Sequence, residues 1–231
     1  MKKRKIAINN DPYNKGFSIC CLDQITIKSG LTVLVGCNGA GKTTLLRNIL
    51  QELQKKKIPC IMYDNLRDGG NNSRSKAGHE GDWKFVFTSL QISEGENISL
   101  NIGSLASKLA EFRDTGRIPD SFNKSDKAVK TKERWLLFDG IDSGYSIDNI
   151  VELKEFFSLI IEDFSKVGCE LYIVVSANEY ELANGEECFD VINGEYIRFS
   201  NYDDFKKFIF KSKQQKELNR NAANSVSQEE G

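Results

Sequence analysis

The 231-residue sequence lacks the features of several large classes of protein. No apolar run approaches the roughly 18–20 residues that an α-helix needs to cross a bilayer. The basic start, Met1–Lys5, is followed by the polar stretch Asn9-Asn10-Asp11, where a signal peptide would carry its apolar core. The expectation is a cytoplasmic protein without a membrane contact.

Histidine is nearly absent, and the cysteines show no metal-binding spacing. His79 is the single histidine, and the six cysteines contain no C-x-x-C pair. We therefore expect free, buried thiols in a reducing compartment. Cys37 stands apart, because it lies inside the glycine-rich loop described below, where oxidation could block a ligand.

The sequence also lacks an excess of charge of either sign. The formal net charge is −1 and the isoelectric point is about 6.0. A nucleic-acid-binding protein with an overall basic surface is thereby excluded, although a local basic patch would be hidden in this sum.

Short apolar runs alternate with helical patterns, and this alternation predicts an α/β fold. Leu31–Val35 is bounded by glycines and reads as a buried parallel strand. Further strands are expected at 60–63, 135–138 and 171–175, a hairpin around Asn193-Gly194, and a small antiparallel sheet from 5–8 and 17–27. Helices are expected at 42–55, 96–112, 146–166 and 201–210. One domain is predicted over residues 1–210, and residues 211–231 read as a polar, disordered tail.

One glycine-rich segment matches a phosphate-binding motif. Gly36-Cys-Asn-Gly-Ala-Gly41-Lys42-Thr43 fits the Walker A pattern G-x-x-x-x-G-K-S/T, between a predicted strand and a predicted helix. Its glycines let successive N–H groups point inward, and the helix N-terminus adds partial positive charge. Lys42 would reach the β- and γ-phosphates, and the Thr43 hydroxyl would ligate Mg²⁺. Asp139, at the end of the 135–138 strand, is the second candidate metal ligand. The sequence thus predicts a P-loop NTPase fold, with a mostly parallel sheet flanked by helices.

Three segments resemble the ABC ATPase superfamily. The loop with its following threonine is similar to that family's form G-x-N-G-x-G-K-S/T-T, through Asn38 and Thr44. Ile92-Ser93-Glu94-Gly95-Glu96 resembles the L-S-G-G-Q/E signature, and the stretch from Asp139 to Asp148 resembles the Walker B and D-loop region. The nucleotide-binding residues that the resemblance implies are Gly36, Asn38, Gly39, Ala40, Gly41, Lys42, Thr43, Thr44, Ser93 and Gly95.

The resemblance implies ATP and Mg²⁺ as ligands and a homodimer that closes around two ATP molecules. In that family, the signature serine and glycine of one subunit cap the γ-phosphate held by the other. Two departures affect catalysis. Gly140 stands where the family has the glutamate that polarises water, and Ser176-Ala177-Asn178 stands where it has a switch histidine. Asp142 and Asn178 are candidate substitutes, with Asp142 as the candidate catalytic residue.

Too few residues separate Thr43 from Ser93 for the coiled-coil arm of SMC-type proteins. The favoured reading is a compact, soluble ABC-type ATPase acting in DNA metabolism, phage biology or defence, with DNA or a protein as its partner. Two alternatives stay open: a nucleotide-gated regulatory switch with little hydrolysis, and the ATPase subunit of a transporter.

Overall fold

The chain folds around a mostly parallel six-stranded sheet, with strand order β4-β5-β6-β3-β7-β8. The structure, a computed structural model, describes residues 2–8, 23–64, 109–117, 131–142 and 146–229. The strands of the large sheet are β3 (Gly30–Val35), β4 (Cys60–Asp64), β5 (Glu133–Asp139), β6 (Glu170–Ser176), β7 (Cys188–Asp190) and β8 (Glu195–Ile197). Within this sheet, among the strands that the structure describes, the β7–β8 pair is antiparallel and the other pairs are parallel. A separate antiparallel pair is formed by β1 (Lys3–Ala7) and β2 (Gln24–Lys28).

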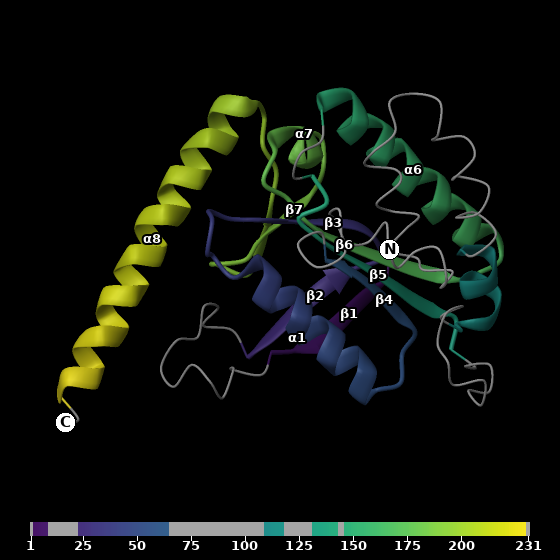
Figure 1. Ribbon diagram of the computed structural model, residues 1–231, viewed down its shortest axis with the longest axis horizontal. Coiled ribbons are helices and arrows are strands. Elements are labelled where there is room, and N and C mark those ends of the chain that lie inside the picture. The colour runs from purple at the N-terminus through teal and green to yellow at the C-terminus, as the bar shows by residue number, and fades with distance from the viewer. Residues whose placement is uncertain (1, 9–22, 65–108, 118–130, 143–145, 230–231) are drawn as a thin grey trace, which may run out of the picture.

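Helices cover both faces of the large sheet (Figure 1). They are α1 (Lys42–Lys55), α6 (Ile147–Lys166), the short α7 (Tyr180–Ala183) and α8 (Tyr202–Glu229). Helix α1 and the β1–β2 pair lie on one face, whereas α6, α7 and the helical residues 109–115 lie on the other. No helix within the described ranges is long and apolar enough to span a membrane.

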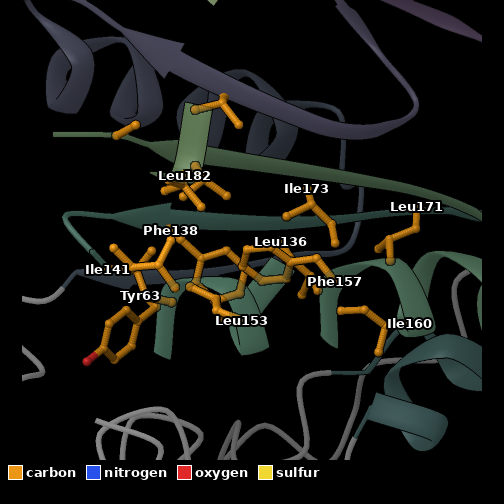
Figure 2. Close-up of a cluster of buried hydrophobic side chains, with 14 of the residues drawn as sticks. Tyr63, Leu136, Phe138, Ile141, Leu153, Phe157, Ile160, Leu171, Ile173 and Leu182 are labelled. Atoms are coloured by element: carbon orange, nitrogen blue, oxygen red, sulfur yellow. The ribbon is translucent and has the colours of Figure 1, made fainter. Parts of the chain in front are cut away.

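The alternation of side chains along the central strands creates two hydrophobic cores. Val33 and Val35 belong to the core under α6, whereas Leu34 belongs to the core under α1. The same division holds in β5, where Phe138 packs 5.2 Å from Phe157 of α6, between ring centroids (Figure 2). Successive strand residues point to opposite faces, so a strand that is apolar throughout must be buried on both sides.

Helix α1 has the bounds that its apolar periodicity predicts. Leu45, Leu46, Ile49 and Leu53 are buried, and Ile6 and Ile27 of the small sheet pack in the same core. The sheet order, the strands and the small antiparallel pair confirm the predicted α/β P-loop fold. The predicted helix 96–112 lies mostly outside the described residues, and its last turn is helical. The one-turn α7 was not predicted.

The last helix is longer than the sequence predicts. A helix over 201–210 was expected, with a disordered tail from 211, but α8 continues to Glu229. Its polar residues carry no apolar stripe, so periodicity gave no signal. However, many of them are Lys, Gln and Glu, which favour helices. Contacts of Ser212 and Lys216 with the rest of the chain also hold the helix in place. The division into 1–210 and 211–231 as separate units stays a prediction.

Candidate functional site

The loop between β3 and α1 has a backbone that only glycine adopts easily. Gly39 has φ 73° and Gly41 has φ 101°, both in the left-handed region. A Cβ on Gly36 would lie 3.0 Å from side-chain atoms of Ala40 and Val191. The loop turns back on itself through a bond from the Ala40 N–H to the Cys37 carbonyl, 3.0 Å long. These features match the geometry for which the Walker A glycines are required.

Lys42 is the first residue of α1 and is 9% exposed. Its ammonium donates to the Gly36 carbonyl at 2.8 Å, so the side chain folds back over the loop. Burial lowers the pKa of Lys42, and the nearby charges of Asp142 and Asp139 oppose this shift. A largely desolvated cation held over a glycine-rich loop is suited to binding an anion.

Asp139 ends strand β5, two strands away from β3 in the sheet. It is 7% exposed, and its Oδ1 accepts a hydrogen bond from the Ser176 hydroxyl at 2.8 Å. The Ser176 oxygen accepts in turn from the Gly140 N–H at 2.7 Å. Because β6 lies between β5 and β3, Ser176 at its end fixes the carboxylate from the side on which the phosphate loop lies. The sequence offered Ser176 only as part of a departure from the family pattern.

Asp142 is 1% exposed and lies close enough to Lys42 for their charges to interact. Its Oδ2 accepts from the N–H groups of Asn178 and Glu179, at 2.5 and 2.8 Å, and its Oδ1 accepts from the Asn178 amide at 3.3 Å. Burial raises the pKa of Asp142, and these hydrogen bonds oppose the rise. Asp142 and Asn178, the two candidate substitutes for the missing catalytic groups, are therefore hydrogen-bonded to each other. Asp142 also anchors the turn that follows β6.

Gly140 has φ 63°, which L residues with a side chain rarely adopt. The position where the resembling family has a glutamate therefore has a backbone conformation that favours glycine in this chain. Thr43 and Thr44 follow Lys42 in the first turn of α1, both half-buried. Ser93 and Gly95 lie outside the described residues, so the structure does not test their part in the site.

Two residues of α8 reach the phosphate loop, and sequence analysis missed both. Ser212 accepts a hydrogen bond from the Cys37 N–H at 3.0 Å, and Lys216 donates to the Asn38 carbonyl at 2.9 Å. Neither belongs to a motif, and each is more than 170 residues away from its partner in sequence. Only the fold brings them together.

The cysteines that the structure describes are thiols. Cys37, Cys60, Cys169 and Cys188 are free and buried, which confirms the prediction for these four. Burial raises the pKa of Cys188 to about 12, so this thiol stays protonated and inert. Cys37 is buried within the phosphate loop.

The residues present fit a nucleotide with Mg²⁺. The loop offers a buried ammonium, backbone N–H groups and the start of α1, and a threonine and an aspartate are the oxygen donors expected for magnesium. Over the described part of the chain, no group of three or more His, Cys, Asp or Glu gathers as a metal site. Mg²⁺ takes one or two protein carboxylates and completes its shell with phosphate and water, so Thr43 and Asp139 would suffice as its protein ligands.

A comparison with family models agrees with this reading of the loop. The model described as CobW/HypB/UreG, nucleotide-binding domain, matches residues 30–73. The match begins with β3 and contains the phosphate loop, α1 and β4, which make up a minor part of the chain. No curated protein matches the chain. The chain thus carries a nucleotide-binding domain of the P-loop NTPase class.

Proposed function

We propose that the chain is an ABC-type ATP-binding protein that binds ATP with Mg²⁺ and hydrolyses it slowly. The observation that carries this proposal is the placement of Lys42. Its ammonium is buried over the glycine loop and bonds a neutral carbonyl, at the end of the sheet where Asp139 and Asp142 also lie. Triphosphate oxygens would supply the negative charge that this desolvated cation lacks in direct contact.

The roles of the remaining groups follow from their positions. Thr43 and Asp139 would hold Mg²⁺, with Ser176 orienting the Asp139 carboxylate. Asp142 would position or deprotonate the attacking water. Its raised pKa suits a proton acceptor better than that of an exposed aspartate would. Two of the three hydrogen bonds that Asp142 accepts come from backbone N–H groups, so its orientation is fixed.

The assignment to the ABC branch, and to ATP rather than another nucleotide, is supported by sequence motifs. Asn38 and Thr44 match the family's form of the loop, and Ser93 with Gly95 resembles its signature. In this proposal, those two residues cap the γ-phosphate held by a second copy of the chain, so that ATP drives homodimer formation. The matching family model names a nucleotide without naming its base. The base must therefore be tested directly.

One observation favours a second candidate function, a nucleotide-gated switch with little hydrolysis. Gly140 carries no carboxylate, and its left-handed backbone makes a glutamate at this position energetically costly. A positioned base typically contributes about 10²–10⁴-fold to rate. A chain without it would stay in the ATP-bound state longer, which suits a protein that signals by binding.

Calorimetry with ATP and GTP, each with Mg²⁺, tests the proposal. Lys42→Ala should lower ATP affinity at least about tenfold, because a charge-assisted contact is worth about 1.5–3 kcal/mol. Lys55→Ala is the matched control, since Lys55 is an exposed lysine at the other end of α1. Equal ATP affinity of wild type and Lys42→Ala would refute nucleotide binding by this loop, and tighter binding of GTP than of ATP would refute the choice of nucleotide.

A further inference from the structure

Helix α8 holds two consecutive residues of the phosphate loop from outside. Ser212 and Lys216 are four residues apart, one helical turn, and so lie on the same face of α8. The first accepts from the Cys37 N–H and the second donates to the Asn38 carbonyl, at 3.0 and 2.9 Å. In Figure 1, α8 runs along one side of the molecule, past the end of α1 where this loop lies.

The position of these two side chains is set by packing at the start of α8. Phe205 is buried and lies in aromatic contact with Phe199 and Tyr180. One turn further on, Ile209 packs against both hydrophobic cores. Ser212 is itself 5% exposed. These contacts fix the start of α8 against the body of the protein, and the residues beside the phosphate loop follow directly after it.

Ser212 secures the first half of the loop. Its oxygen takes the Cys37 N–H, and it lies 3.7 Å from where a Cβ on Gly36 would stand. This distance is an ordinary van der Waals contact, so Ser212 packs directly against the start of the loop. The Cys37 amide is thereby satisfied by protein, which makes Ser212 a positioning residue for the loop.

Lys216 adds a positive charge beside the loop. Its ammonium has three donors, and the structure shows one of them spent on a neutral carbonyl. It forms no salt bridge with a carboxylate within the described ranges. Its Nζ lies 3.5 Å from where a Cβ on Gly39 would stand, so the charge lies at the left-handed turn of the loop. A bound anion beside the loop would explain a lysine at this position better than its hydrogen bond to a neutral carbonyl does.

We infer that Lys216 is a second phosphate-binding cation, delivered to the nucleotide site by the C-terminal helix of the same chain. The inference rests on the proposed nucleotide binding and adds α8 to that site. Lys42 approaches the phosphates from the start of α1, and Lys216 approaches from the outer side of the loop. Ser212 keeps the loop and the helix in register, so binding of the triphosphate and docking of α8 stabilise each other.

Calorimetry of four proteins tests the inference: wild type, Lys216→Gln, Lys211→Gln and Lys42→Ala. The ligands are ATP, ADP and inorganic tripolyphosphate, which carries no base. Lys216→Gln should lower the affinity for ATP and tripolyphosphate by about three- to tenfold, since the lysine is half-exposed and its contact is partly screened. The loss should be smaller for ADP, which carries less charge, and smaller at high salt. Lys211→Gln removes the same charge from an exposed position on α8 and should leave affinity unchanged.

Hydrogen exchange without nucleotide tests the docking of α8 separately. Ser212→Ala should speed exchange of the Cys37 amide, because that amide loses its acceptor. An unchanged exchange rate of the Cys37 amide would refute the docking of α8 on the loop through Ser212. Wild-type binding that is lost in Lys42→Ala but retained fully in Lys216→Gln would overturn this inference alone, as would tighter binding by Lys216→Gln. Failure of the wild type to bind any of the three ligands would overturn the proposed function, and the inference with it.

Discussion

Replacement of Asp142 by alanine should destabilise the protein strongly, whatever its part in catalysis. The carboxylate is the acceptor for the N–H groups of Asn178 and Glu179. These bonds are partly buried, and a hydrogen bond to a charged group contributes about 1.5–3 kcal/mol. Part of this contribution is offset, because burial already disfavours the charged carboxylate, as its raised pKa shows. We expect a net loss of about 2–4 kcal/mol, or about 5–15 °C in Tm for a domain of this size.

The assay is thermal unfolding followed by circular dichroism, with Asp23→Ala as the control. Asp23 is exposed, and only its backbone carbonyl is used in pairing with Ile8. Asp142→Asn keeps one acceptor oxygen and should lose about half as much stability. A fall in Tm for Asp142→Ala no larger than that of the control would refute the anchoring role derived from the hydrogen bonds.

Phosphate release by Asp142→Asn then tests the catalytic proposal. The variant should still bind ATP and should lose the residual turnover by about 10²–10⁴-fold. Turnover equal to that of the wild type, with a folded protein, would show that Asp142 is an anchor and that the base lies elsewhere.

Three further predictions concern pH, the backbone and assembly. Because burial raises the pKa of Asp142 above 3.8, the pH-dependent part of its contribution to stability is fully present below that pH and is lost as pH rises through the raised value. The hydrogen bonds that its carboxyl group accepts remain at higher pH. The difference in Tm between wild type and Asp142→Asn should therefore shrink from about pH 4 upwards without vanishing, and a constant difference would contradict this. Gly140→Ala should lower the free energy of unfolding in denaturant by about 1–2 kcal/mol. Gly185→Ala should lower it by the same amount, because Gly185 has φ 78° and no atom within 4 Å of an added Cβ. Gly140→Glu should also lower the Tm, and faster hydrolysis without a loss of stability would show that the loop accepts a side chain. Ser93→Arg should block the ATP-dependent dimer in light scattering while leaving ATP binding intact, and a wild type that stays monomeric with saturating ATP and Mg²⁺ would refute the assembly.

The sequence predicted best the elements whose signal is local. The bounds of α1 follow from buried leucines and isoleucines at helical spacing, and Ser146 caps α6 where its helix was expected to begin. The Asn193-Gly194 turn joins β7 and β8 as predicted. The phosphate loop was readable because each of its glycines and Lys42 has a separate physical task.

What the sequence could not predict depends on contacts between distant residues. Ser176 is an ordinary strand-ending serine until the sheet order places it against Asp139. Gly140 reads as a missing glutamate in sequence, and only its φ of 63° shows that the backbone there favours glycine. The contacts of Ser212 and Lys216 carry no local signal, because a polar helix without an apolar stripe is stabilised by what it touches.

The position of β3 has a consequence for how the protein is made. This strand pairs with β6 and β7, both of which are synthesised long after it, and its loop bonds Ser212, 175 residues beyond Cys37. A chain leaving the ribosome therefore carries the phosphate loop early but cannot pair either edge of β3 until most of the protein has emerged. Such long-range pairing slows folding, and the unpaired apolar strand invites association with other nascent chains. Synthesis that ends before Ser212 would give a chain that contains the whole Walker A sequence and lacks the hydrogen bond by which α8 holds this loop.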